Sequence, residues 1–332
     1  MNTVSKAGDK RMNRWLVGLL MIGIAPLSAL ADEASTYPDR LIHIVVPFVA
    51  GGTGDVLARR IGGKLAQHLS QPVLIENRAG ANTSLASEYV AKAAADGYTL
   101  YSTNTSLIQV PMLYASRYDE ARDFVPVAQY ASIPLVLAVR AEIPAKNFKE
   151  LVAYLKARPG KTSYGSNGAG GTQHIYSEAL KRAAGVDSVH IPYKGESPLL
   201  TDFLGGRLDW YIASPITIMQ YVRSGKIRLL AVTGDQRLPL APDVPTFKEE
   251  GMTDLTVVGW MGLFAPSKTP KPIVAKLSKA LADIVRSPEV SDYLRESGMI
   301  PTGLDAMEFR EKLPSFREAF LRMIRENNIK VE

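Results

Sequence analysis

The chain has 332 residues, a formal net charge of +6, four histidines and no cysteine. The lack of cysteine excludes disulfide bonds, thiolate zinc sites, cysteine nucleophiles and a lipidated cysteine. No dense run of Lys and Arg with interleaved aromatic residues follows the first 31 residues, so the sequence lacks the pattern of a nucleic-acid-binding surface.

The first 31 residues have the three parts of a secretory signal peptide. Four basic residues lie within residues 6–14, an apolar segment covers residues 15–25, and Ala-Leu-Ala at 29–31 is a small-x-small cleavage site. A retained membrane anchor is the alternative, but the apolar segment is too short to span a bilayer and Pro26 follows at once. We therefore expect export to the periplasm and a mature protein that begins at Asp32.

Removal of this leader takes away four basic residues and one acid, so the net charge falls from +6 to +3. A mild positive charge of this size favours anionic ligands only weakly. The remaining chain of roughly 300 residues suits two domains of about 150 residues each.

Strands and helices alternate in the first half of the mature chain. Apolar patterning predicts strands over residues 41–46, 73–75 and 98–102, and helices over residues 53–69 and 83–94. This alternation predicts a parallel sheet, whose ligands bind beyond the carboxyl ends of its strands. Glycine and small polar residues fill the segments at those ends: FVAGGTGD (48–55), ENRAGANTS (76–84) and STNTS (102–106).

A second alternating region follows. We expect strands over residues 134–139, 188–191 and 207–212, and helices over residues 148–157, from about 174 to 184, and up to 204. Three polar loops separate these elements: SYGSNGAGGTQH (163–174), PYKGESP (192–198) and ASP (213–215). The last segment, residues 270–328, has the pattern of two or more amphipathic helices.

Two α/β lobes with glycine-rich loops predict a cleft that closes by a hinge on a small ligand. The strand–turn–helix at residues 45–55 directs unpaired N–H groups and a helix N-terminus at the turn, which favours an anion. Neutral donors beside both loops favour an anion of carboxylate size. These donors are Thr53, Asn104, Thr105, Ser166, Asn167 and Thr172. The alternative is that the glycines only permit tight turns.

Enzyme and metal motifs fail on inspection. Gly160-Lys161-Thr162 lacks the preceding glycine of a phosphate-binding loop, and Ser166 is not in a Gly-x-Ser-x-Gly elbow. The histidines have no metal-ligand spacing, and no spacing supports a Ser166–His174–Asp209 triad. We therefore expect no enzymatic activity, no cofactor and no metal. His174 has two readings: a hydrogen bond to ligand or loop, or a structural histidine at a helix start.

Six segments, in this order along the chain, resemble the Bug family, also called TctC-like proteins. This family comprises the periplasmic solute receptors of tripartite tricarboxylate transporters. The segments are YPDRLIHIVVPFVAGGTGDVLAR (37–59), VLIENRAGANTSLASEYVAKAAADGYTL (73–100), YGSNGAGGTQH (164–174), HIPYKGESPLLTDFLGGRLD (190–209), LAVTGDQRLPLAPDVPTFKEEG (230–251) and WMGLFAPSKTP (260–270).

The resemblance implies an α/β fold, a two-lobed periplasmic binding protein of the Venus flytrap type. Each lobe is expected to be a mainly parallel sheet flanked by helices. With residues 1–31 as the signal peptide, lobe 1 would comprise residues 32–130 and 257–332, and lobe 2 residues 131–256. The lobes are expected to close on a small carboxylate, which bridging waters often help to hold.

Matching positions imply the ligand-binding residues. Phe48, Ala50, Gly51 and Thr53 would line the anion turn of the first lobe, with Asn104 and Thr105 beside them. Ser166, Gly168, Thr172 and His174 would face them from the second lobe. Tyr193 is expected near the cleft or hinge, Asp209 at the end of a strand that enters it, and Ser214 just beyond.

The chain departs from the family pattern in two places. Residues 49–52 read Val-Ala-Gly-Gly, where the family often has Ala-Pro-Gly-Gly. Four residues after Asp209, where the family often has a second acid, this chain has Ala213. Loss of this acid would make the site unsuitable for an amino group and open it to aromatic or simple dicarboxylate ligands.

The sequence thus predicts a monomeric, non-enzymatic receptor that delivers a small carboxylate to the membrane subunits of a tripartite tricarboxylate transporter. The alternative is a periplasmic subunit that presents the carboxylate to a two-component sensor kinase. A secreted hydrolase acting through Ser166 is a more distant third.

Overall fold

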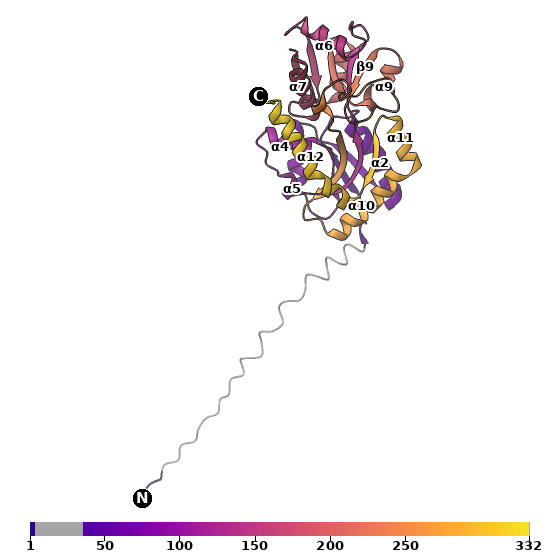
Figure 1. Cartoon of the computed structure of the whole chain (residues 1–332). Coiled ribbons are helices and arrows are strands. Elements are labelled where there is room, and N and C mark those ends of the chain that lie inside the picture. Colours follow the sequence, from indigo (N-terminus) through magenta and orange to yellow (C-terminus); the bar gives the residue numbers. More distant parts are fainter. Residues whose placement is uncertain (4–35, 332) are drawn as a thin grey trace. The chain divides into compact units, whose positions relative to one another are not determined.

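The structure is a computed structural model that describes residues 1–3 and 36–331 (Figure 1). The signal peptide expected over residues 1–31 therefore lies almost wholly outside the described residues. From residue 38 onward the chain builds two sheets with helices packed against them.

The first sheet has six strands in the order β11-β4-β10-β3-β1-β2. Strand β1 pairs in parallel with β2 and β3, whereas β10 pairs antiparallel with β3 and β4, and β11 antiparallel with β4. The strands are β1 (Ile42–Val46), β2 (Val73–Asn77), β3 (Thr99–Asn104), β4 (Phe124–Ile133), β10 (Gly259–Pro266) and β11 (Ile300–Leu304).

The second sheet has five strands in the order β7-β6-β8-β5-β9. Strand β6 pairs in parallel with β7 and β8, whereas β5 pairs antiparallel with β8 and β9. The strands are β5 (Val136–Arg140), β6 (Ser163–Ser166), β7 (Val189–Pro192), β8 (Trp210–Ala213) and β9 (Ile227–Val232).

The expected two-lobed α/β fold is confirmed, but both sheets are mixed rather than mainly parallel. The difference arises where the chain passes between the sheets, from β4 to β5 and from β9 to β10. The strands at these crossings do not follow a βαβ crossover within one sheet, so they run against their neighbours. Strands β4, β6, β9, β10 and β11 were not among the strands predicted from the sequence, and β6 occupies residues that were expected to belong to a polar loop, SYGSNGAGGTQH (163–174).

Helices cover the first sheet on both faces. In Figure 1, α2, α10 and α11 lie on one side of it, and α4, α5 and α12 on the other. Helix α2 buries Leu57, Ile61 and Leu65, the face predicted from their spacing. The helices with this sheet are α2 (Thr53–Leu69), α3 (Ser84–Ala91), α4 (Ser106–Leu113), α5 (Glu120–Asp123), α10 (Lys271–Arg286), α11 (Pro288–Glu296) and α12 (Ala306–Glu326), with a 3-10 turn η1 (Ala81–Thr83).

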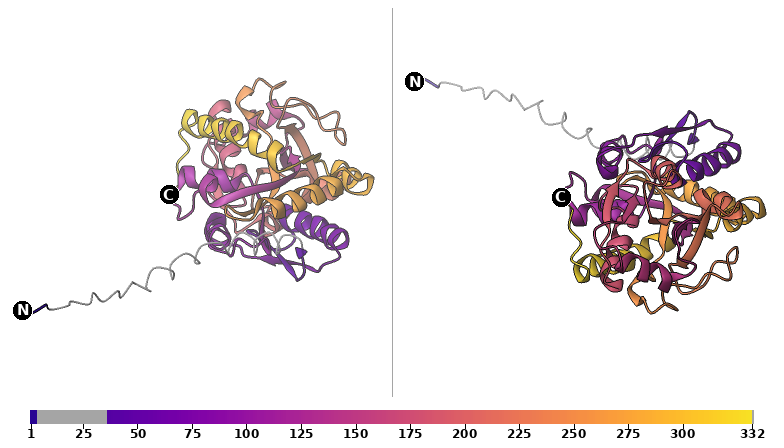
Figure 2. Two further views of the ribbon diagram at one scale, coloured as in Figure 1. Left: turned by 90° about the horizontal axis from the view of Figure 1, so that it is seen from below. Right: turned by 90° about the horizontal axis from the view of Figure 1, so that it is seen from above.

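Each helix of the second sheet follows one of its strands: α6 (Phe148–Lys156) follows β5, α7 (Thr172–Ala184) follows β6, α8 (Glu196–Leu204) follows β7 and α9 (Pro215–Arg223) follows β8. A 3-10 turn η2 (Thr253–Leu255) lies before β10. The views from below and from above in Figure 2 show orange helices of the late part of the chain beside the purple, early part, where α10 packs against α2.

The C-terminal segment contains the predicted amphipathic helices and also strand β11. Helix α12 begins at a capping box, in which Asp305 accepts hydrogen bonds from the N–H groups of Met307 and Glu308. Its Phe309 packs edge-on against Trp260 of β10, with ring centroids 5.1 Å apart. This packing ties the end of the chain to the first sheet.

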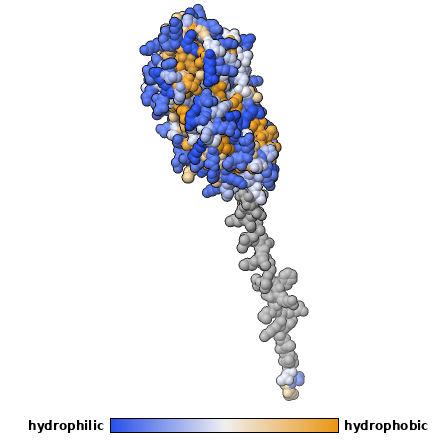
Figure 3. Space-filling view, turned by 90° about the vertical axis from the view of Figure 1, so that its right-hand side faces the viewer, coloured by the Kyte–Doolittle hydropathy of each residue, from blue (hydrophilic) through white to orange (hydrophobic). Residues whose placement is uncertain are grey.

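Charged and polar residues cover most of the face shown in Figure 3, with smaller apolar areas among them. Within the described part of the chain, no helix is both long enough and apolar enough to cross a membrane.

Candidate functional site

A cavity of about 50 Å³ lies where residues of the two lobes meet. The first turns of five helices reach it: Thr53 begins α2, Thr105 precedes α4, Thr172 begins α7, Glu196 begins α8 and Ser214 precedes α9. Helix N-termini carry unpaired N–H groups and the positive end of the helix dipole, so their convergence favours a bound anion. The lining residues are Phe48, Val49, Gly52, Thr53, Gly54, Asn104, Thr105, Ile133, Leu135, Asn167, Thr172, Gln173, Glu196, Ser214, Gly259, Trp260 and Met261.

The turn between β1 and α2 is held by Asp55. Its carboxylate accepts hydrogen bonds from the Gly51 N–H and the Asn77 side chain, each at 2.9 Å, and forms an ion pair with Arg59. Burial alone would raise the pKa of Asp55, but these hydrogen bonds and Arg59 lower it below its usual value. Gly51 has φ +83°, a conformation that glycine adopts without strain. The ionised Asp55 therefore fixes the turn that presents Thr53.

Hydrogen bonds join the two lobes around the cavity. The Thr105 and Thr172 hydroxyls lie 2.6 Å apart, and the Thr172 hydroxyl also lies 2.9 Å from the Gln109 side-chain oxygen. On the rim, the Asn82 amide donates to the Ala169 carbonyl oxygen. The lobes are thus in contact in a closed arrangement.

Glu196 is a member of this site that the sequence analysis missed. The residue is 5% exposed, and its side chain lines the cavity. Thr53 of the opposite lobe donates to Oε2 at 2.9 Å. Three donors reach Oε1: the Ser214 N–H at 3.1 Å, the Thr217 hydroxyl at 3.0 Å and the Gln173 amide at 3.4 Å. Burial raises the pKa of Glu196, and the four hydrogen bonds oppose that shift.

The expectation that this site has lost an acid is therefore wrong. Ala213 does not line the cavity; it packs in the apolar core of the second sheet with residues such as Val136 and Phe203. The acid comes instead from Glu196, at the start of a helix after the PYKG loop. An acid directly after a glycine loop and before an apolar run was the only signal for it in the sequence.

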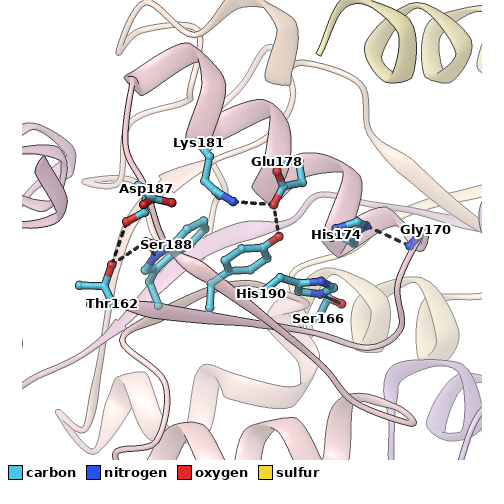
Figure 4. Close-up of polar contacts among 11 residues, drawn as sticks. Thr162, Ser166, Gly170, His174, Glu178, Lys181, Asp187, Ser188 and His190 are labelled. Carbon is cyan, nitrogen blue, oxygen red and sulfur yellow. Dashed lines mark hydrogen bonds and ion pairs between the residues drawn. The ribbon is translucent and has the colours of Figure 1, made fainter. Parts of the chain in front are cut away.

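Ser166 and His174 support the glycine loop from behind (Figure 4). The Ser166 hydroxyl contacts the Gly168 carbonyl oxygen at 3.1 Å and His190 Nε2 at 2.7 Å. His174 Nδ1 accepts a hydrogen bond from the Gly170 N–H at 3.0 Å, and its ring stacks on His190 with centroids 4.1 Å apart. His174 thus has the expected hydrogen bond to the loop and, in the first turn of α7, is also a structural histidine at a helix start.

Both stacked imidazoles are harder to protonate than a free histidine. Burial is the main cause that lowers the pKa of His174; burial, and after it the electrostatic effect of the neighbouring His174 ring, lowers the pKa of His190 to about 4. The nearby Glu178 carboxylate is bonded to the Tyr164 hydroxyl and to Lys181 at 2.9 Å (Figure 4). Ser166 and His174 therefore serve the shape of the loop and do not form a triad with Asp209.

Asp209 lies just before the first residue of β8, at the end of the strand away from the cavity, whereas Ser214 at the cavity follows that strand. The Asp209 carboxylate accepts a hydrogen bond from the Ser163 N–H at 2.8 Å. The expectation that Asp209 ends the strand entering the cleft is therefore wrong, because the strand begins three residues later than predicted.

The structure brings together some of the expected site residues and separates others. Phe48, Thr53, Asn104, Thr105, Thr172 and Ser214 line the 50 Å³ cavity. Gly168 and Tyr193 line an adjoining cavity of about 220 Å³, which Phe48 also borders. Gly51 borders an outer groove of about 580 Å³ together with Glu196 and Ser197. The Ala50 carbonyl oxygen accepts a hydrogen bond from the Ser197 hydroxyl at 3.2 Å.

The chain matches the family of tripartite tricarboxylate transporter receptors, TctC, over residues 57–322. It is 35% identical over 292 residues to a protein of Pseudomonas sp. (strain P51), with 87% of each chain covered. It is 33% identical over 290 residues to the protein BugT of Bordetella pertussis, which covers 86% of this chain and 89% of that one.

Solved structures agree with this assignment. The periplasmic binding protein BugD has a TM-score of 0.84 and 30% identity, covering 89% of this chain and all of its own. Rpa4515 of R. palustris with adipate has a TM-score of 0.85 and 33% identity, and the match covers 89% of this chain and 99% of Rpa4515. MatC of Rhodopseudomonas palustris with bound malate has a TM-score of 0.81 and 30% identity, and the match covers 87% of this chain and 100% of MatC. The chain therefore belongs to the TctC, or Bug, family of solute-binding receptors, and it is a receptor rather than an enzyme.

Proposed function

We propose that the protein binds one small carboxylate in the 50 Å³ cavity and delivers it to the membrane subunits of a tripartite tricarboxylate transporter. The observation that carries this proposal is the convergence of five helix N-terminal turns on one cavity lined by neutral hydrogen-bond donors. The adipate bound to Rpa4515 and the malate bound to MatC are both carboxylates, which supports the same ligand class.

Neutral donors hold the ligand carboxylate. Asn104 supplies an amide donor at the cavity. Thr53, Thr105 and Thr172 contribute the backbone N–H groups of three helix starts, because their hydroxyl protons already bond to Glu196, Thr172 and Gln109. The indole N–H of Trp260, another lining residue, has no hydrogen-bond partner among the described residues and adds a further donor. A site without a cationic side chain binds the anion reversibly, because release does not require the separation of a buried ion pair.

Binding is coupled to hinge closure. Lobe 1, residues 32–130 and 257–332, and lobe 2, residues 131–256, move about the two crossings between β4 and β5 and between β9 and β10. The ligand stabilises the closed form because it contacts donors from both lobes at once. The closed form is the one that docks on the transporter.

The remaining expected site residues act around the cavity. The outer groove is bordered by Gly51, and the adjoining cavity by Gly168 and Tyr193. The glycine loop is held by hydrogen bonds to Ser166 and His174. Residues 1–31 direct export to the periplasm, where the mature protein acts as a monomer without metal or cofactor.

A thermal-shift screen of the mature protein against small mono-, di- and tricarboxylates tests this function. A ligand at about 100 times its dissociation constant adds about 2.7 kcal/mol to the free energy of unfolding, which raises the Tm by several degrees. Mass spectrometry of the denatured protein first establishes that no ligand was co-purified. Failure of every carboxylate to raise the Tm of ligand-free protein would contradict the proposal.

A further inference from the structure

Glu196 gives the cavity an electrostatic character that a simple anion site would not have. Among the described residues that line it, Glu196 alone carries an ionisable side chain, and that side chain is acidic. A carboxylate ligand must therefore bind beside a protein carboxylate. Like charges in a buried site repel each other strongly unless a donor separates them.

The hydrogen bonds of Glu196 indicate which group can stand beside it. Two backbone or amide N–H groups, from Ser214 and Gln173, can only donate, so Oε1 acts as an acceptor. With the Thr217 hydroxyl, Oε1 has three contacts, whereas Oε2 has one, from Thr53 across the cleft. A carboxylate oxygen accepts about two hydrogen bonds, so Oε2 can accept one more.

Local helix geometry stabilises the negative charge of Glu196. The residue lies in the first turn of α8, and its carboxylate accepts the backbone N–H of Ser214, which precedes α9. Both helices thus present their positive ends to the same side chain. These N–H groups favour the charged form of the carboxylate, against the burial that raises the pKa of Glu196.

We propose that Glu196 selects carboxylates that carry a second group able to donate a hydrogen bond, a hydroxyl or an ammonium, next to the carboxylate. This inference rests on the proposed function. The ligand carboxylate meets the neutral donors, and its donor group meets Oε2 of Glu196. A ligand of the same skeleton without such a group leaves Thr53 as the one donor to Oε2, and nothing then separates the ligand carboxylate from the Glu196 carboxylate.

The test is calorimetric titration of the ligand-free mature protein with succinate, L-malate and L-aspartate. These three share a four-carbon dicarboxylate skeleton and differ in the hydrogen, hydroxyl or ammonium at C2. We expect malate or aspartate to bind at least tenfold more tightly than succinate, and the better of the two identifies the donor group. In Glu196→Gln this preference should fall below threefold. The control Glu249→Gln, which removes an exposed acid paired with Arg237, should retain it.

The wild-type ranking needs no variant, so the inference stays testable if Glu196→Gln does not fold. Succinate binding as tight as that of malate and aspartate would overturn this inference and leave the receptor function intact. If folded Glu196→Gln kept the wild-type preference for malate or aspartate over succinate, the inference would also be overturned. The same holds if none of the three binds but another carboxylate without a hydroxyl or ammonium group does. Failure of every carboxylate in the thermal-shift screen would contradict the proposed function itself.

Discussion

Thr53, at the start of α2, donates its hydroxyl proton to Glu196, at the start of α8, over 2.9 Å and across the boundary between the two lobes. Both residues are nearly buried, with 8% and 5% of their surfaces exposed. The contact joins the anion turn of the first lobe to the only acid of the cavity in the described residues, so we expect it to link ligand binding to closure.

We predict that Thr53→Val weakens ligand binding. The change leaves Oε2 of Glu196 without its partner in the closed form, which costs about 1–2 kcal/mol and thus lowers affinity roughly 5- to 30-fold. Calorimetric titration with the ligand found in the screen measures the effect. The control Thr256→Val removes a hydroxyl bonded only to the Thr253 carbonyl oxygen and should bind normally. Equal affinity of Thr53→Val and wild type would contradict the prediction.

Gly168→Ala should prevent closure. Gly168 has φ +141°, and a Cβ there would collide with the side-chain oxygen of Asn82 from the opposite lobe. We expect at least a tenfold loss of affinity and no decrease in the radius of gyration, measured by small-angle scattering, when ligand is added. A Gly168→Ala variant that compacts with ligand as wild type does would refute this.

Gly63→Ala is the matched control for that variant. A Cβ at Gly63 meets no atom within 4 Å, and the residue lies inside α2. Alanine in a helix interior stabilises by roughly 0.5–1 kcal/mol relative to glycine. We expect Gly63→Ala to bind ligand normally and to have a slightly raised Tm.

The fold should lose stability in mild acid because of His190. A histidine in the unfolded chain takes up a proton at a pH of about 6.5. In the folded protein, burial lowers the pKa of His190 to about 4. Above pH of about 6.5 both states are neutral and His190 contributes no pH dependence. As the pH falls through this window to about 4, only the unfolded chain gains the proton, so the free energy of unfolding decreases.

Because His190 is only partly buried, solvent screening reduces the effect, and we expect a loss of about 1–2 kcal/mol across this window. Urea unfolding at a series of pH values measures it. His190→Gln keeps a polar partner for Ser166 and should have a flatter profile, whereas His68→Gln, at an exposed site on α2, should keep the wild-type slope. A slope in His190→Gln equal to that of wild type would contradict the prediction.

Ligand binding should change the fluorescence of Trp260 and not that of Trp210. Trp260 lines the cavity, whereas Trp210 in β8 stacks on Tyr164 with centroids 4.8 Å apart and does not line it. Saturating ligand should therefore alter the emission of wild type and of Trp210→Phe. The change should be absent in Trp260→Phe that still binds by calorimetry. A change carried mainly by Trp210 would place the ligand elsewhere.

The parts of the site that are local in sequence could be predicted. Thr53 and Thr172 each begin a helix that follows a strand, and Asn104 is the last residue of β3, so the carboxyl-end rule for parallel strands placed them at the cavity. The predicted strands β1, β2, β3, β5 and β7 agree with the structure to within about two residues, since each is bounded by turn residues.

The parts of the site that depend on tertiary contacts could not be predicted from the sequence. Glu196 has its partners on α2, α7 and α9, and no spacing along the chain reveals that these helices meet. The contact of Ser166 with His190 arises from the pairing of β6 with β7. Strands β4 and β10 are buried almost throughout, so they lack the alternation that marks a strand with one exposed face.

The most direct test of the central claim is calorimetric titration of ligand-free mature protein with the carboxylate that gives the largest thermal shift. The structure predicts one site per chain, with saturable heat in wild type and weakened binding in Thr53→Val. Absence of saturable binding by wild type, in protein shown by mass spectrometry to be ligand-free, would contradict the assignment of this cavity as a carboxylate site.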